Sequence, residues 1–294
     1  MARRHRSRLI ARPELRRETQ SAAGQKVRRA AFSAVLLTSP PSATVRGTTS
    51  RRERRMDTAA PAADIAQGLE SLARGYRILA MNGHTEGTLG HLSWRDPEGR
   101  GLWMKCQEIG LDEVEPGDLH LIGWDGKVLD GSNGHRHSEW VIHSETYKAR
   151  EDVHSVGHTH PTYAVLFSAT KEKLVGVGHN GSYFSDVKIF DKTLALIRTD
   201  EDAAAMAADL GDQWAVLLRN HGVTFCGTSI EHCVLMGIMV EKACYEQLFM
   251  KSSGYEWSGK IRTGLKDEAS LYPRLITNLW NYHNRKLDRF EGRR

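Results

Sequence analysis

The chain has 294 residues, and its formal charge of +5 comes from 41 Lys and Arg against 36 Asp and Glu. No apolar run reaches the roughly 18–20 residues that a membrane-spanning helix needs, so we expect no membrane association of that kind. The 4 cysteines show no Cys-x-x-Cys spacing, so neither a zinc ribbon nor a disulfide framework is indicated, and a reduced, cytoplasmic setting fits best.

The first 55 residues differ in charge from the rest of the chain. They carry 15 Lys and Arg against 3 Glu, a net charge of +12, which leaves −7 for residues 56–294. This segment has no sustained periodicity, so we expect a disordered basic extension. It lacks the interleaved aromatics of a nucleic-acid-binding arm and the long apolar run of an export signal. We therefore expect Met56 to be the natural start, and residues 56–294 to form a single domain without a nucleic-acid partner.

Residues 56–294 show helix and strand patterns in mixed order. Ser138 is a candidate N-cap for the helix that carries Glu139, and Pro273 begins a C-terminal helical arm. Because hairpin strands are mixed with helices, without strict β-α-β alternation, we predict an α/β fold with a mixed or antiparallel sheet covered by helices. In chain order we expect a helix at 65–79, strands at 91–95, 102–105, 118–124 and 127–129, the Glu139 helix, a strand at 154–160, a helix at 162–169, strands at 215–218 and 223–227, and helices at 229–250 and 273–287.

Two histidines end one of these strands, in the run Gly157-His158-Thr159-His160-Pro161. Residues two apart on a strand point to the same face, so His158 and His160 can reach one ion. His221 would complete the set from a second strand, and Gly222 would let the backbone turn away without a Cβ clash. Three neutral imidazoles leave a coordination position open, as in a catalytic metal site. The competing interpretation is an ordinary hydrogen-bonded cluster of core histidines.

In combination these motifs resemble the class II aldolase/adducin family, whose signature is a Glu on a helix, a His-x-His-Pro run and a later Asn-His-Gly. The likeness runs from about Ile65 to about Phe249. It implies a three-layer α/β/α fold with a central mixed sheet, and a homotetramer whose active sites lie at subunit contacts. It also implies Glu139 as catalytic acid/base and candidate fourth ligand. The metal ligands that it implies are His158, His160 and His221.

A dication held by imidazoles acts as a Lewis acid and would stabilise a metal-bound enolate. Zn, Mn, Fe and Co all suit such ligands, so the metal stays open. Retro-aldol cleavage and decarboxylation share this intermediate, so the site predicts a carbon–carbon lyase without choosing between them. The family's sugar-phosphate aldolases bind phosphate with Gly-Asn, Ser-Gly and paired Ser, where this chain has Gly90-His91, residues 105–110 and His137-Ser138. Glu108 would also repel a phosphate dianion, so a phosphorylated sugar is a poor candidate.

The same pocket gains His91, His135, His137 and Arg136, which suit carboxylates and phenolic oxygens. Residues 90–97 and 139–143 resemble the family's decarboxylase branch, which acts on acids of aromatic catabolism such as dihydroxyphthalates. The resemblance thus implies a decarboxylase of an aromatic or ring-fission hydroxy-carboxylic acid.

Tyr163, three residues beyond His160, either supplies a phenolic proton or packs as an ordinary aromatic. His143 and Tyr147, one helical turn apart, are expected to be structural. Three alternatives to the decarboxylase stay open. They are an aldolase for a non-phosphorylated hydroxy-keto acid, an adducin-like binding protein, and an iron-dependent oxygenase. Adducin-like members lack the metal ligands, so the three histidines count against the second.

Overall fold

The computed structural model describes residues 65–131, 134–184, 186–256 and 272–293. The basic extension predicted at 1–55 and the start proposed at Met56 lie outside the described residues. A seven-stranded sheet has the order β3-β2-β1-β4-β7-β6-β5, in which only the β5–β6 pair is parallel. The strands are β1 (His91–Arg95), β2 (Gly101–Lys105), β3 (Leu119–Gly123), β4 (Ser155–Thr159), β5 (Ile189–Phe190), β6 (Ala215–Leu218) and β7 (Gly222–Gly227).

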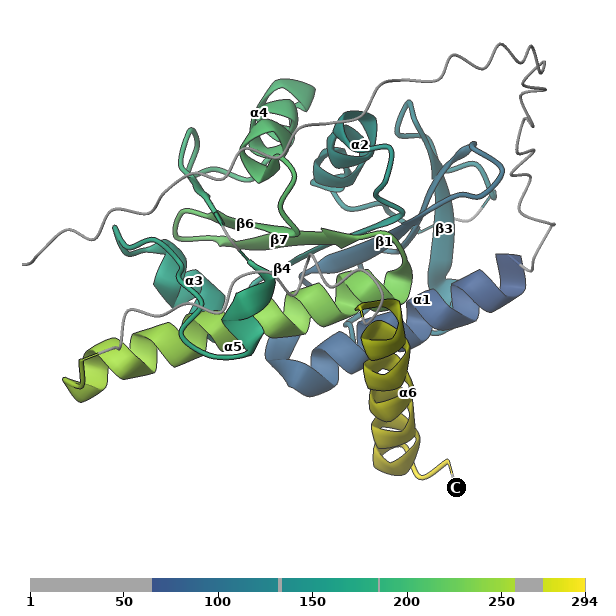
Figure 1. Ribbon diagram of the computed structural model, residues 1–294. Coiled ribbons are helices and arrows are strands. Elements are labelled where there is room, and N and C mark those ends of the chain that lie inside the picture. The colour runs from purple at the N-terminus through teal and green to yellow at the C-terminus, as the bar shows by residue number, and fades with distance from the viewer. Residues whose placement is uncertain (1–64, 132–133, 185, 257–271, 294) are drawn as a thin grey trace, which may run out of the picture. The chain divides into compact units, whose positions relative to one another are not determined.

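Helices cover both faces of this sheet. Figure 1 shows α2 and α4 over one face and α1, α3 and α5 over the other. The predicted three-layer α/β/α fold with a mixed sheet is therefore confirmed. No described helix is both long and apolar enough to cross a membrane. The helices are α1 (Ile65–Leu79), α2 (Trp140–Ala149), α3 (Thr162–Ser168), α4 (Asp200–Leu210), α5 (Ile230–Ser253) and α6 (Tyr272–Phe290), with single turns η1 (Ala80–His84), η2 (Pro116–Asp118) and η3 (Asn180–Tyr183).

The strands supply side chains to two cores. In β6, Ala215 and Leu217 pack with α1 and α5, whereas Val216 and Leu218 pack with α2 and α4. Successive side chains of a strand point to opposite faces, and both faces are covered here. This explains why β6 is a continuous apolar run and not an alternating one.

Several predicted boundaries need correction. Helix α2 begins at Trp140, so Glu139 and not Ser138 is the N-cap residue, and its side chain makes no capping bond. The segment after the Asp125-Gly126 turn forms a single bridge to β3 and no strand. Strand β5, which has two residues, and helix α4 were not predicted. A signal for α4 was present in the sequence, because Thr199 is a typical N-cap residue and its hydroxyl accepts a hydrogen bond from the N–H of Asp202.

Antiparallel pairing brings distant histidines to one end of the sheet. His91 on β1 lies opposite His158 on β4. His160 follows β4 directly, and β4 pairs with β7 so that Thr159 lies opposite Val223. His221 lies in the turn between β6 and β7, where its N–H donates to the carbonyl of Leu218 at 3.1 Å, and not on a strand as expected.

The turn that carries His221 depends on Asn220 for its shape. Asn220 has φ +54°, in the left-handed region that Asn tolerates better than most residues, and its N–H donates to Oγ of Ser168 at 3.0 Å. Gly222 has a different purpose from the predicted one. A Cβ at Gly222 would lie 2.5 Å from the carbonyl oxygen of Thr159 and 2.7 Å from Cδ2 of His160. Glycine is therefore required by close packing and not by the direction of the chain.

Candidate metal centre

Three imidazoles converge where β4 ends and the β6–β7 turn begins. The ring centroids of His158, His160 and His221 are 4.9 Å apart in each of the three pairs. Their candidate ligand nitrogens all lie within 4.8 Å of one another, and Nε2 of His158 is 3.1 Å from Nε2 of His160. Tetrahedral zinc with bonds of about 2.0–2.1 Å would hold its nitrogens about 3.3–3.4 Å apart. The spacing therefore suits a small dication.

The electrostatics of the three rings also suit a cation. Burial lowers the pKa of His158 well below its ordinary value, and His160 and His221 lower it further. Burial lowers the pKa of His221 to about 4, and it lowers that of His160 although Glu86 acts in the opposite direction. Neutral rings keep a lone pair for a metal. Nε2 of His221 is buried and has no hydrogen-bond partner among the described residues, as expected of a ligand atom.

Two outer contacts orient these rings. Oε2 of Glu86 lies 2.9 Å from Nδ1 of His160, and Oγ1 of Thr224 lies 3.2 Å from Nδ1 of His158. Each contact engages Nδ1 and leaves Nε2 directed at the centre of the cluster, as is common for metal-binding histidines. Neither Glu86 nor Thr224 could be identified from the sequence, because neither belongs to a recognisable motif.

Glu139 adjoins the imidazole cluster and is only 7% exposed. One carboxylate oxygen of Glu139 and one nitrogen each of His91 and His158 form a second group of candidate ligand atoms within 4.8 Å of one another. Burial raises the pKa of Glu139, against the opposing effects of Arg198 and of the Ile197 N–H, which donates to Oε1 at 3.0 Å. A carboxyl with a raised pKa is suited to exchange a proton near neutral pH.

Two more histidines lie beside the cluster. The ring centroid of His91 is 5.2 Å from that of His158 and 4.6 Å from that of His137. Lys105, which is fully buried, donates from Nζ to Nε2 of His137 at 3.0 Å and to the carbonyls of Thr88 and Cys106 at 3.0 and 3.3 Å. Burial lowers the pKa of Lys105 to about 8 and that of His137 to about 3. In the part of the chain that the structure describes, no carboxylate forms an ion pair with Lys105. The burial of Lys105 was not predicted from the sequence.

Arg136 and His135 are also predicted near the substrate, and their described contacts are with neither the three imidazoles nor Glu139. The guanidinium of Arg136 donates from Nε to the carbonyl of Gly126 at 2.7 Å and lies 5.1 Å from the ring centre of Trp140. The exposed His135 has Nδ1 2.5 Å from Oε1 of Glu108. Arg136 thus links a turn to helix α2 through its observed contacts, and its role in substrate binding is untested.

Tyr163 lies on α3 and is 39% exposed. Its ring packs against Tyr245 of α5, with centroids 4.8 Å apart. Within the described segments Tyr163 makes no contact with the three imidazoles, so the packing role is the one that its surroundings support. Its predicted role as a proton donor is untested.

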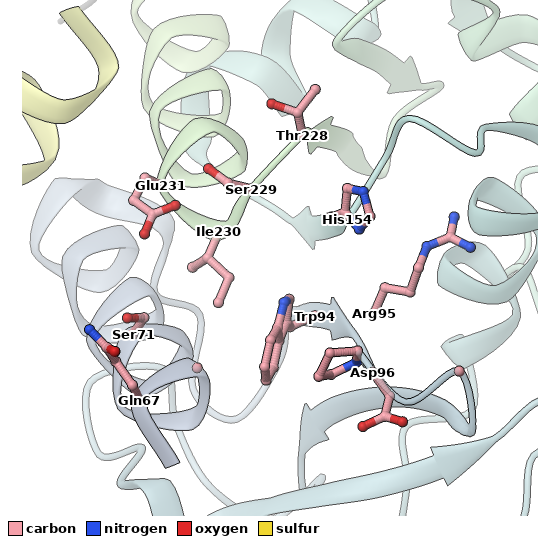
Figure 2. Close-up of a pocket in the computed structure, with 13 residues that line it drawn as sticks. Gln67, Ser71, Trp94, Arg95, Asp96, His154, Thr228, Ser229, Ile230 and Glu231 are labelled. Carbon is pink, nitrogen blue, oxygen red and sulfur yellow. The ribbon is translucent and has the colours of Figure 1, made fainter. Parts of the chain in front are cut away.

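A cavity of about 600 Å³ lies at the opposite end of β1 and β4, around the start of α5 (Figure 2). Its most conspicuous charged groups are already engaged. Arg95 donates to the carbonyls of Tyr147, Arg150 and Val153. Asp96 accepts bonds from Arg100 and Trp103. These groups hold the fold together at the cavity, so the imidazole cluster is the better candidate for chemistry.

Comparison with known proteins identifies the family. The family described as "Class II Aldolase and Adducin N-terminal domain" matches residues 70–248. The chain is 32% identical to a 3,4-dihydroxyphthalate decarboxylase of Arthrobacter keyseri over 204 residues, covering 63% of this chain and 79% of the relative. It is 31% identical to the meiotically up-regulated gene 14 protein of Schizosaccharomyces pombe over 195 residues, covering 63% and 73%. L-fuculose 1-phosphate aldolase from Glaciozyma antarctica PI12 superposes with a TM-score of 0.65 and 25% identity, covering 79% of this chain and 92% of that chain. The predicted resemblance is confirmed: the chain belongs to the class II aldolase and adducin family.

Proposed function

We propose that the protein is a divalent-metal-dependent carbon–carbon lyase that decarboxylates an aromatic or ring-fission hydroxy-carboxylic acid. The observation that carries this proposal is the convergence of three neutral imidazoles with the buried carboxyl of Glu139. Relatives named as decarboxylases support it, among them the Arthrobacter keyseri enzyme and the 27% identical decarboxylase NovR of Streptomyces niveus.

His158, His160 and His221 would hold the metal, with Glu139 as a fourth ligand that substrate displaces. When bound, a dication supplies Lewis-acid polarisation of substrate oxygens. The residues and their spacing suit Zn, Mn, Fe or Co and do not choose among them.

Glu139 would move the proton at the carbon that loses CO2. Burial raises the pKa of its carboxyl, whereas a bound dication would lower it while the carboxylate is a ligand. Once substrate has displaced it from the metal, the carboxyl could take up a proton. A protonated carboxyl beside the reacting carbon can deliver the proton that replaces the carboxylate.

The buried Lys105 favours an anionic substrate. Among the described residues its ammonium has only uncharged acceptors, namely His137 and the carbonyls of Thr88 and Cys106. A buried cation without a counter-ion is unfavourable, and an anion bound nearby would offset that cost. His91 and His137 would contact the substrate carboxylate, with Lys105 behind them.

Retro-aldol cleavage of a non-phosphorylated hydroxy-keto acid is the second candidate. The superposition on L-fuculose 1-phosphate aldolase favours it, and the same cluster of residues would support it. We also propose the homotetramer implied by the family, to be checked by light scattering of the purified protein.

The test is a product assay on protein loaded separately with Zn, Mn, Fe or Co. The probes are 3,4-dihydroxyphthalate, other ortho-hydroxy aromatic acids and hydroxy-keto acids, with CO2, aldehyde and O2 uptake measured together. Metal-stimulated CO2 release without aldehyde supports the proposal, and aldehyde release supports the aldolase. A requirement for O2 would identify an oxygenase instead. Absence of metal binding under all conditions would refute every version of a metal lyase.

A further inference from the structure

Four buried side chains form a hydrogen-bonded chain that ends at the imidazole cluster. Nδ1 of His91 lies 2.6 Å from Nε2 of His143, whose Nδ1 lies 2.7 Å from Oγ of Ser93. Oγ of Ser93 in turn lies 2.7 Å from the hydroxyl of Tyr147. None of the four residues is more than 2% exposed. Strand β1 supplies His91 and Ser93 from one face, and α2 supplies His143 and Tyr147 from successive turns.

The hydrogen bonds of this chain can be donated in either of two directions, because each contact needs one donor and one acceptor. Burial lowers the pKa of His143 to about 3 and that of His91 well below its ordinary value, so each ring carries one proton. In the inward direction Tyr147 donates to Ser93, Ser93 donates to His143, and His143 donates to His91. In the outward direction His91 donates to His143, and His143 donates to Ser93. Either Tyr147 must then donate to the carbonyl of His154, or Ser93 must donate to the carbonyl of Val156.

The distances favour the inward direction. The other acceptors are the carbonyl of His154 for the hydroxyl of Tyr147 and the carbonyl of Val156 for that of Ser93, each at 3.4 Å. That distance exceeds the usual 2.5–3.0 Å of an O–H···O hydrogen bond. The outward direction would thus leave one buried hydroxyl poorly satisfied. The inward direction gives Tyr147, Ser93 and His143 acceptors at 2.6–2.7 Å and leaves only Nε2–H of His91 for a bond into the site.

We propose that Tyr147, Ser93 and His143 hold His91 in the tautomer that is protonated on Nε2. His91 then donates a hydrogen bond into the site and is not a metal ligand. Of the two groups of candidate ligand atoms, the group of His91, Glu139 and His158 would then lack a ligand, because a protonated nitrogen has no lone pair for a metal. Ser93, His143 and Tyr147 become positioning residues.

The position of the proton rests on the hydrogen-bond distances and on both rings being neutral, whereas its use rests on the proposed function. Within that function, Nε2–H of His91 would bond to a substrate oxygen as negative charge develops on it. The donor is fixed before substrate arrives, since its three partners are buried in the fold.

The first test measures metal binding by titration of the metal-free protein. His91→Gln is expected to bind zinc within about threefold of the parent protein, since no ligand is removed, and His158→Gln is expected to lose stoichiometric binding. A loss of zinc in His91→Gln comparable to that in His158→Gln would overturn the proposal.

The second test observes the proton directly, by nitrogen-15 NMR of histidine-labelled protein or by neutron diffraction. The parent protein is expected to carry the His91 proton on Nε2. Ser93→Ala is expected to release some of His91 to the other tautomer. The matched control is Ser155→Ala, which removes an equally buried hydroxyl that donates to the carbonyl of Ser93 at 2.7 Å outside the chain. A parent protein with the proton on Nδ1 would refute the proposal whether or not the variants fold.

The third test applies once a substrate is known. Glutamine can place an amide donor near the position of Nε2, whereas asparagine is too short. His91→Asn is expected to lower kcat by about 100-fold, the range for one donor to a developing charge, and His91→Gln is expected to lower it less. Equal losses in both variants would exclude the donor role. If no lyase activity exists, the first two tests still decide the tautomer of His91. Failure of the tautomer proposal can therefore be told apart from failure of the proposed function.

Discussion

The two ends of strands β1 and β4 both carry charged and polar side chains, but these side chains are bonded differently at the two ends. At the cavity end, Arg95 and Asp96 direct their hydrogen bonds at backbone carbonyls or neighbouring side chains. At the imidazole end, Nε2 of His221 is buried without a described partner, and Lys105 has no described carboxylate. Unused hydrogen-bonding capacity of buried groups, more than the size of a cavity, therefore marks the imidazole end as the candidate for chemistry.

The largest expected effect comes from removing a metal ligand at the imidazole end. His160→Ala is expected to lose bound metal and to lower kcat/KM by at least about 1000-fold, because Lewis-acid stabilisation disappears. His154→Ala is the matched control, since His154 is an exposed histidine at the cavity end. Elemental analysis and the product assay read out both variants. Full activity in a metal-free His160→Ala protein would mean that activity does not depend on a metal at the imidazole end.

The next effect comes from Glu139→Gln, which keeps the shape of the side chain but not its proton chemistry. We expect bound metal to stay and kcat to fall by about 10²–10⁴-fold. The pH–rate profile of the parent should have a limb set by the carboxyl of Glu139, whose pKa burial raises and a bound dication would lower, and the variant should lack that limb. An unchanged profile in the variant would assign that limb to another group.

A smaller effect is expected from Lys105→Met, which replaces the buried ammonium by an apolar chain of similar length. KM for a carboxylate substrate should rise by about tenfold, while the free energy of unfolding should stay the same or increase, because a buried charge without a counter-ion is removed. Lys127→Met, at a side chain that is 78% exposed, changes the net charge equally and serves as control. An equal rise in KM in both variants would point to net charge alone.

The smallest effect concerns stability in acid. His84, beside the imidazole end, has a pKa lowered to about 3 by burial, from an ordinary value of 6.5. Between these values the unfolded chain binds more protons, so the contribution of His84 is complete above pH 6.5 and declines as pH falls towards 3. The decline should approach about 1.4 kcal/mol per pH unit. Urea unfolding of metal-free protein should show a shallower pH dependence in His84→Asn than in the parent.

Periodicity was sufficient to predict a mixed sheet covered by helices, and the family resemblance added the three layers. Motif spacing was sufficient to predict that His158, His160 and His221 converge. Side chains two apart on one strand share a face, so the meeting of His158 and His160 followed from local geometry. The outer partners could not be found in this way. Glu86 reaches His160 across 74 positions of the chain, and Lys105 reaches His137 across 32. Their roles exist only in the folded arrangement.

Two limits of the sequence have equally physical causes. Arg136 was predicted near the substrate because a guanidinium suits carboxylates, and the prediction stays untested. Its observed contacts, with the carbonyl of Gly126 and the ring of Trp140, could not be read from the sequence. Strand β5 has only two residues, too few for any alternation to be visible. Short elements and side-chain direction therefore remained beyond what the pattern specified.

The absence of a side chain at Gly222 allows the close packing beside the candidate metal site. The ring of His160 and the carbonyl of Thr159 occupy the volume that even one methyl group would need. Any larger residue at position 222 would have to displace the ring of His160 or the carbonyl of Thr159. The spacing of the candidate ligands is thus governed in part by a residue that has no ligand atom of its own.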